Sequence, residues 1–182
     1  MLKSEPFGEF DPLHPCTIPG LFAENVYAEP VVIDAPVELT WQIIIDFDRY
    51  PEWNPLNRFF RLDTRAEVGQ MVTFGPCWGP YDGATLPDAD FTQHETLTVW
   101  EENCCLAYGV ISRWFNAERA QHVSPMQDGR TRYQTYERMS GIIKPLVRRL
   151  YAVRIVAGFT ANGVALKRRA EAMAGPSATD TP

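Results

Sequence analysis

Two glutamates on predicted strands are the residues of this sequence best placed for acid–base chemistry. Residues 131–139 alternate in character with a period of two, which is typical of a strand whose faces differ. One face of this strand carries Tyr133, Thr135, Glu137 and Met139. The more apolar face of a second predicted strand carries Phe91, Gln93, Glu95, Leu97 and Val99. A carboxylate that points from such a face into an apolar interior has a raised pKa and can act as a general acid or base.

Glu137 and Glu95 are therefore our candidate catalytic residues. Glu137 also has a structural alternative, because it could pair with an arginine or cap the turn at Ser140–Gly141. Replacing Glu137 by glutamine would separate these roles, since glutamine keeps the shape but cannot transfer a proton.

Three further polar side chains lie on elements that could face the same interior. Tyr108 alternates with Leu106 toward the inside, where its hydroxyl would bond a ligand or simply a buried neighbour. Arg119 could hold an anionic or carbonyl oxygen if it pointed inward, but we expect it to be outward and solvated. Asn162 stands in the uncharged middle of a long helix, where it would contact a ligand or a strand backbone group.

No metal, nucleophile or cofactor motif accompanies these residues. The histidines do not have the spacing of a Ser-His-Asp or Cys-His site: His94 and His122 lie opposite the inward faces, so we expect them at the surface, and His14 lies near the N-terminus. The four cysteines form no CxxC pair: Cys16, Cys77, Cys104 and Cys105. We therefore expect no metal, no cofactor and no disulfide framework.

The composition indicates one domain in a reducing compartment. The chain has 182 residues and a net charge of −6, which disfavours a nucleic-acid partner. Its first 15 residues lack the apolar core of a signal peptide, so we expect a cytoplasmic protein. We expect an irregular arm over residues 1–24, a ligand-binding domain over residues 25–174 and a disordered tail over residues 175–182.

The longest predicted element is a helix over residues 140–174. Ser140 or Gly141 can cap it, Pro145 suits its first turn, and Gly175-Pro176 ends it. From Ile155 to Leu166 it has no charge and is apolar on every side, which predicts a helix enclosed by the rest of the protein and too short in its apolar part to span a membrane. Basic residues gather near both ends, where we expect them to be solvated.

The elements that must enclose this helix are mostly strands. A strand over residues 26–34 contains Pro30, which marks it as an edge or bulged strand. A short helix follows over residues 36–47, and residues 49–55 allow a second short helix or turn. Period-two patterns then predict six strands: 56–64, 70–74, 91–101, 104–113, 117–124 and 131–139. These seven strands, mostly in a consecutive meander with one apolar face, need a cover, and the long helix is the element that can provide it.

Residues 75–90 interrupt the strand pattern. They contain two Gly-Pro steps and one Asp-Gly step, together with Trp78 and Tyr81. Loops of this length inside a compact domain are usually functional lids or disordered, and the aromatic residues favour an ordered lid. Trp78 is accordingly a candidate ligand-binding residue.

Three stretches resemble the START-like superfamily, also called SRPBCC, which includes polyketide cyclases and dehydrases, lipid-transport domains and the birch-pollen allergens. The first is VVIDAPVELTWQIIIDFDRYPEWNP at residues 31–55, and the second is LTVWEENCCLAYG at residues 97–109. The third runs from GRTRYQTYERMSGIIKPLV at residues 129–147 to GFTANGVALKRRAE at residues 158–171. The resemblance covers about residues 26–172.

This resemblance implies an α+β helix-grip fold, with a curved seven-stranded antiparallel sheet wrapped around a long C-terminal helix and short helices after the first strand. Met139 matches a position that the family usually fills with a large apolar residue, which assigns the face of Glu137 to the interior. A cavity between sheet and helix is then expected. Its candidate ligand-binding residues are Trp78, Gln93, Tyr108, Arg119, Tyr133, Thr135, Tyr151, Phe159 and Asn162.

Two classes of function remain open at this point. The chain could bind a polyketide-like or other apolar small molecule and catalyse its cyclisation, dehydration or a related acid–base rearrangement, without a cofactor. It could instead be a non-catalytic carrier or sensor of a hydrophobic ligand, and a weaker third reading is an interaction module. Inward carboxylates favour the enzyme, since a carrier gains little from burying them. We expect a monomer or a homodimer.

Overall fold

The computed structural model describes residues 23–62, 66–81, 86 and 88–175. The predicted arm, with His14 and Cys16, lies outside these residues except for its last two positions, and so does the predicted tail beyond Gly175. Within the described ranges none of the helices combines the length and apolar character that a membrane-spanning segment requires.

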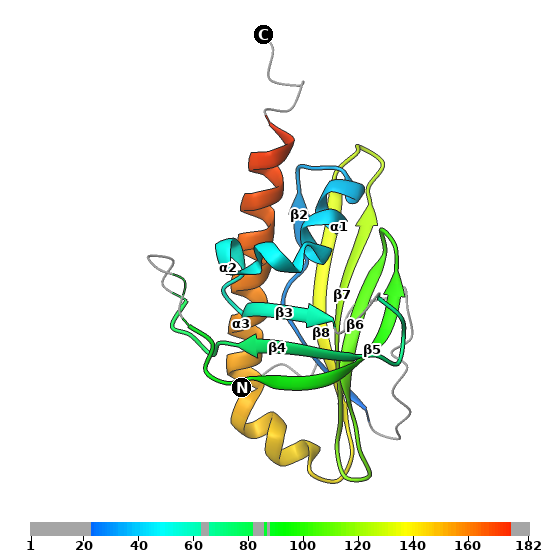
Figure 1. Cartoon of the computed structure of the whole chain (residues 1–182), viewed down its shortest axis with the longest axis vertical. Helices are drawn as coiled ribbons and strands as arrows, with labels where there is room; N and C mark the ends of the chain where they lie inside the picture. The colour runs from blue at the N-terminus through cyan, green and yellow to red at the C-terminus, as the bar shows by residue number, and fades with distance from the viewer. Residues whose placement is uncertain (1–22, 63–65, 82–85, 87, 176–182) are drawn as a thin grey trace.

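The strands form one antiparallel sheet, as predicted (Figure 1). In chain order they are β1 (Glu24–Tyr27), β2 (Val31–Ile33), β3 (Asn57–Leu62), β4 (Met71–Pro76), β5 (Gln93–Glu101), β6 (Cys105–Ile111), β7 (Asn116–Pro125) and β8 (Thr131–Ser140). The order across the sheet is β1-β8-β7-β6-β5-β4-β3, and β2 pairs with β8 beside β1. The predicted first strand is therefore two short edge strands, separated at Pro30, which has no N–H to donate to the ladder.

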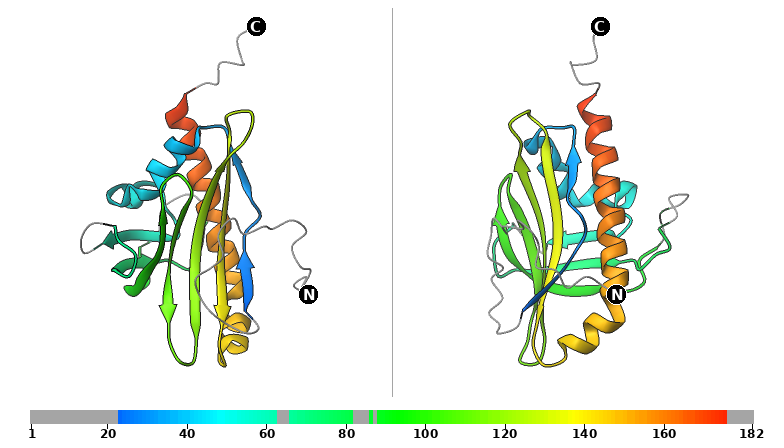
Figure 2. Two further views of the ribbon diagram at one scale, coloured as in Figure 1. Left: turned by 90° about the vertical axis from the view of Figure 1, so that its right-hand side faces the viewer. Right: turned by 180° about the vertical axis from the view of Figure 1, so that it is seen from behind.

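The long helix α3 (Lys144–Ala174) lies across the concave face of this sheet, which gives the predicted helix-grip arrangement (Figure 2). Pro145 falls in its first turn, as expected. The expected cap is wrong, because Ser140 is the last residue of β8 and its hydroxyl accepts a hydrogen bond from Asn116 at 3.2 Å. Gly141 makes the turn into the helix with a φ of 103°, a value that favours glycine.

The expectation that α3 would be enclosed on all sides is also wrong. One side faces the sheet, where Ile155, Phe159, Asn162 and Leu166 are buried. The opposite side is open to solvent, and Leu146, Leu150 and Val153 on it are 59%, 58% and 69% exposed. Val164, within the uncharged stretch itself, is 49% exposed. None of the elements that the structure describes covers this side, so the apolar residues of the helix belong to two faces with different surroundings.

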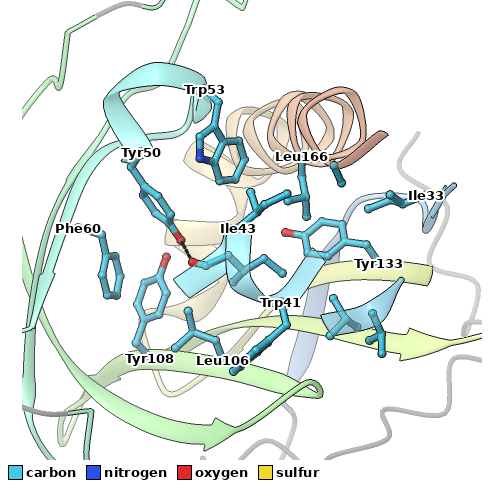
Figure 3. Close-up of a cluster of buried hydrophobic side chains, with 14 of the residues drawn as sticks. Ile33, Trp41, Ile43, Tyr50, Trp53, Phe60, Leu106, Tyr108, Tyr133 and Leu166 are labelled. Atoms are coloured by element: carbon cyan, nitrogen blue, oxygen red, sulfur yellow. Dashed lines mark hydrogen bonds between the residues drawn. The ribbon is translucent and has the colours of Figure 1, made fainter. Parts of the chain in front are cut away.

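One half of the space between α3 and the sheet is filled by a hydrophobic core. The helix α1 (Val37–Ile45) inserts Trp41, Ile43 and Ile44 into it, and Trp41 meets Trp100 edge to face at 5.8 Å. The short helices η1 (Phe47–Arg49) and α2 (Tyr50–Trp53) close the end of this core. The hydroxyl of Tyr50 donates to the carbonyl of Ile44 at 2.7 Å, so that its polar end is satisfied inside the cluster (Figure 3).

Two glycines in the middle of α3 mark close contacts with other elements. A Cβ at Gly163 would lie 3.1 Å from Val31 of β2, and a Cβ at Gly158 would lie 2.7 Å from Leu56 and 2.8 Å from the Tyr81 hydroxyl. The small residues of the helix centre therefore admit the sheet edge at one position and the 75–90 loop at the other.

Candidate functional site

The other half of the space between α3 and the sheet contains a cavity of about 280 Å³. This volume is close to the lower end of the range of about 300–1,000 Å³ for small-molecule pockets, so it suits a ligand of one or two rings. Its walls are mostly apolar side chains of the sheet, the 75–90 loop and α3: Leu56, Phe74, Pro76, Trp78, Phe91, Val110, Phe115, Ala117, Val147, Tyr151, Ile155 and Phe159. Its polar lining consists of Asn57, Gln93, Glu95, Tyr108, Arg119 and Glu137.

Cross-strand pairing brings three of these polar residues into one row on the concave face. Tyr108 of β6 pairs with Arg119 of β7, and Arg119 pairs with Glu137 of β8. Side chains directly opposite one another in neighbouring strands lie about 5 Å apart at Cβ. The inward prediction for Glu137 and Tyr108 is confirmed, whereas the outward prediction for Arg119 is wrong. Arg119 is 7% exposed and lines the cavity.

Arg119 is held by hydrogen bonds from all three guanidinium nitrogens. It donates to the Tyr108 hydroxyl at 3.0 Å, to Asn162 Oδ1 at 3.0 Å and to Thr135 Oγ1 at 3.3 Å. Its guanidinium lies over the Phe159 ring, 4.8 Å from the ring centre, which is favourable for a cation. These three bonds use three of the five N–H groups of an arginine, so donors remain for a ligand oxygen.

A polar layer lies behind Arg119 and contains three residues predicted as ligand contacts, Tyr133, Thr135 and Asn162, together with Gln121. The Tyr133 hydroxyl is 2.9 Å from Asn162 Oδ1 and 3.1 Å from Gln121 Oε1. Tyr133, Thr135 and Asn162 do not line the cavity, so the structure places them as supports of Arg119. The Tyr108 hydroxyl also accepts a hydrogen bond from Asn57 Nδ2 at 2.9 Å, so it bonds buried neighbours while its side chain lines the cavity.

Both candidate glutamates line the cavity, and their surroundings favour the protonated form. Burial raises the pKa of Glu137 to about 7 against the opposing effect of the Arg119 charge. Burial also raises the pKa of Glu95 to about 8, with a further increase from the Glu137 carboxylate and opposing effects from Gln93 and Arg119. The two carboxyls influence each other, so near neutral pH the pair retains about one proton.

The two glutamates differ in what holds them. Glu95 accepts a hydrogen bond from Gln93 Nε2 on the same strand. The side chain of Glu137, which β8 places opposite Val26 and Arg119, makes no hydrogen bond and no ion pair with any residue that the structure describes, so neither of its predicted structural roles is observed. Its carboxylate faces the cavity beside a buried cation, where a ligand or water can reach it.

The described part of the 75–90 loop borders the cavity through Trp78. The Trp78 amide donates to Asp90 Oδ2 at 2.7 Å, and its ring lies 6.2 Å from that of Tyr151 on α3. The Tyr81 hydroxyl donates to the Cys77 carbonyl. The predicted lid role is compatible with this position, but residues 82–85 and 87 lie outside the described ranges.

The strand patterns misplaced two other residues. A β-bulge between Leu97 and Val99 in the β5–β6 pairing turns Val99 to the outer face of the sheet and lets Trp100 reach Trp41. His122 lies on the outer face, as expected, but it is 8% exposed rather than at the surface, with Nε2 3.6 Å from the Cys104 sulfur. Across the described residues, no cluster of three or more His, Cys, Asp or Glu side chains could hold a metal ion.

Several cavity residues were not predicted. Asn57 follows the Trp53-Asn54-Pro55 turn, and the Asn54 side chain accepts hydrogen bonds from the Leu56 and Asn57 amides at 3.0 and 2.8 Å, which fixes the start of β3. Phe74 could have been found from the period of β4, where Val72 and Phe74 share one buried face. Phe115, Val147 and Ile155 carry no comparable signal in the sequence.

Solved structures with this arrangement of sheet and helix are known. The Zhui aromatase/cyclase from Streptomyces sp. R1128 is 14% identical, with a TM-score of 0.58, over 85% of this chain and 99% of that one. A START superfamily protein from Mycobacterium smegmatis is 18% identical, with a TM-score of 0.56, over 83% and 98%. The chain has the START-like fold.

A third START-like structure is the di-domain aromatase/cyclase StfQ from the steffimycin biosynthetic pathway, which is 15% identical with a TM-score of 0.59. The alignment covers 85% of this chain and 53% of StfQ. No protein-family model matches the sequence, and no curated protein matches it. At these identities the likeness shows the START-like fold, while the chemistry of this chain has to be argued from its own residues.

Proposed function

We propose that this chain binds an apolar small molecule of one or two rings that carries a carbonyl group, and that it catalyses an acid–base rearrangement such as cyclisation or dehydration. The observation that carries the proposal is the unpartnered carboxylate of Glu137 beside the buried cation of Arg119 in an apolar cavity. Burying such groups is costly unless they have a task, so a site that only encloses an apolar ligand gains nothing from them.

Each polar group has a role in this chemistry. Glu137, whose pKa is the lower of the two, removes a proton from a carbon next to the ligand carbonyl. The remaining N–H donors of Arg119 stabilise the enolate oxygen that forms. Glu95 keeps its proton to a higher pH and gives it to the alkoxide of a ring closure or to the hydroxyl that leaves as water. The proton that Glu137 took from the ligand carbon then passes to Glu95, which restores the starting protonation of both residues.

The similarity to aromatase/cyclases supports this proposal only through the shared fold. Three polar residues of the cavity, Glu137, Arg119 and Glu95, favour an enzyme. The mostly apolar lining favours the alternative, a hydrophobic carrier. The two hypotheses differ in one measurable property, which is proton exchange on a bound ketone.

The experiment uses α-tetralone, a two-ring aryl ketone, in deuterated water with the purified protein. We expect deuterium to enter the carbon next to the carbonyl faster than in buffer, as followed by NMR. Glu137→Gln should slow the exchange by roughly 10²–10⁴-fold while leaving the dissociation constant nearly unchanged. Glu67→Gln, at an exposed residue away from the cavity, is the matched control. Binding without exchange would support the carrier and would remove Glu137 from any mechanism.

A further inference from the structure

One end of the molecule is apolar on its outer surface. Six exposed side chains belong to it, and we call them the apolar end: Ile111, Trp114, Ile142, Ile143, Leu146 and Leu150. Ile142 is 74% exposed, and the other five are between 44% and 60% exposed. Single exposed apolar residues are ordinary, but a cluster of them marks an interaction surface.

The six residues come from two segments that lie side by side. Ile111 and Trp114 are in the β6–β7 hairpin, and the other four are in the β8–α3 turn and the first turns of α3. The Trp114 carbonyl accepts a hydrogen bond from the Ile143 amide at 3.5 Å, which joins the segments. Both lie at the lower end of the molecule in Figures 1 and 2.

The charges around the apolar end are positive, although the chain as a whole carries −6. Arg113 lies over the Trp114 ring at 5.1 Å, and Arg149 and Arg154 are exposed on α3. No acidic residue occurs between Glu137 and Glu171 in the sequence. Glu24 of β1 reaches this region, and it is paired with Lys144 and Arg148 at 2.8 Å.

The apolar end also lies next to an opening of the cavity. Neighbouring residues alternate between the two surfaces: Val110 and Phe115 line the cavity beside Ile111 and Trp114, and Val147 and Tyr151 line it beside Leu146 and Leu150. Val110 and Tyr151 are 36% and 40% exposed, so the cavity reaches the surface here. An apolar ligand would cross this surface on its way to Arg119.

We propose that the apolar end docks on an anionic lipid surface. Exposed aliphatic side chains, a tryptophan and arginines that pair with no acid among the described residues are the combination that binds the interface of an anionic bilayer. A second copy of the chain fits less well, because a two-fold contact would bring Arg149 and Arg154 toward the same charges of the other copy. Docking places the cavity mouth at the membrane, where apolar molecules dissolve.

Vesicle flotation of the intact protein without added ligand tests this proposal. We expect binding to vesicles of phosphatidylcholine and phosphatidylglycerol in equal parts, little binding to pure phosphatidylcholine, and weaker binding as salt rises. Each arginine near an anionic surface strengthens binding about fivefold, so the double variant Arg149→Glu/Arg154→Glu should bind at least roughly 25-fold more weakly.

Ile142→Asp/Leu146→Asp should abolish binding, because it places charge in the apolar contact. Met173→Asp is the control, since Met173 is 57% exposed at the other end of the same helix. Ile142→Asp/Leu146→Asp and Met173→Asp replace only exposed residues, and a melting temperature equal to that of the wild type shows that each variant folds. Absence of vesicle binding by the wild type, or equal loss in Met173→Asp, overturns the proposal.

Light scattering tests the alternative that a second copy of the chain binds the apolar end. A dimer of the wild type that becomes monomeric in Ile142→Asp/Leu146→Asp, without vesicle binding, would assign the apolar end to self-association and overturn the lipid proposal. The outcome is independent of the proton-exchange experiment, because docking is measured without ligand and exchange without lipid.

Discussion

Beside Leu166 and Ala170 of α3, the concave face of the sheet is packed solid, whereas beside Ile155 and Phe159 the same face borders a cavity. The two halves share one helix and one sheet, and they differ in what lies between. In the first half, α1 inserts Trp41 and its neighbours. In the second half no element of the described chain takes the place of α1, and the space stays open.

The boundary between the halves is the hydrogen-bonded layer around Arg119. On the side of the core Arg119 donates to Asn162 and Thr135, and Tyr133 bonds Asn162. On the side of the cavity Arg119 and Glu137 face open space. At one end of the fold, apolar residues pack together and stabilise the protein. At the other end, titratable residues face a space that a ligand can occupy. Substitutions in the two halves and at their boundary test this difference.

The largest difference should appear when an aromatic residue is removed from each half. Trp41 is 1% exposed, and Trp41→Ala leaves a void that should lower the free energy of unfolding by about 3–5 kcal/mol. Phe91 lines the cavity and is 46% exposed, so Phe91→Ala should cost less than about 1 kcal/mol. Urea unfolding at one pH measures both. Equal losses would mean that the cavity half is packed as tightly as the core.

Removing the charge from the boundary should have the next largest effect. Arg119→Met deletes three hydrogen bonds inside a buried layer and should lower the free energy of unfolding by about 2–4 kcal/mol. Arg148→Met is the matched control, because Arg148 pairs with Glu24 at the surface, where such pairs contribute about 1 kcal/mol or less. If the two variants unfold at the same urea concentration, Arg119 does not hold the layer together.

The two glutamates should make stability fall as pH rises. Their folded-state pKa values, about 7 and about 8, lie above the value of about 4.3 for an unfolded glutamate. Between these limits the folded chain binds more protons than the unfolded chain, so the stabilising effect is fully present below about pH 4 and is lost as pH rises through 7 and 8. Because water in the cavity screens the carboxyls, we expect the free energy of unfolding to fall by a total of about 2 kcal/mol between pH 5 and pH 8.

The control for this pH effect is the double variant Glu95→Gln/Glu137→Gln, which cannot lose those protons. It should be less sensitive to pH over this range and more stable than the wild type at pH 8. Urea unfolding at several pH values gives the two slopes. Parallel slopes for the wild type and the variant would show that the carboxyls are ionised at neutral pH.

Much of the fold could be predicted from the sequence, because the hydrophobic periods of strands and helices locate the elements. The alternation in β8, together with the family resemblance at Met139, placed Glu137 inside, and Pro30 correctly marked the broken edge strand. Arg119 was misplaced because one strand's alternation does not say which face is inside. Its pairing with Glu137 fixes that, but pairing register comes from tertiary contacts.

The remaining errors have the same origin in contacts that no local pattern contains. The bulge that turns Val99 outward depends on the pairing of β5 with β6. The exposure of Leu146 and Val153 depends on α3 having no second layer over it among the described elements. Asn57 was missed because its role depends on the Tyr108 hydroxyl, 51 residues away. Sequence patterns thus predicted elements and faces, while the cavity depends on which elements meet.

The smallest expected effect on stability comes from adding side-chain volume to the cavity half. Ala117 of β7 lines the cavity, so the larger side chain of Ala117→Leu can extend into empty space, and the free energy of unfolding should change by less than about 0.5 kcal/mol. Ala170 is fully buried beside α1, where the same substitution overpacks the core and should cost about 1–3 kcal/mol. Ala117→Leu should still weaken α-tetralone binding, because it occupies the volume that the ligand needs. Urea unfolding and a tetralone titration measure the two quantities, and unchanged tetralone affinity in a folded Ala117→Leu variant would place the ligand outside this cavity.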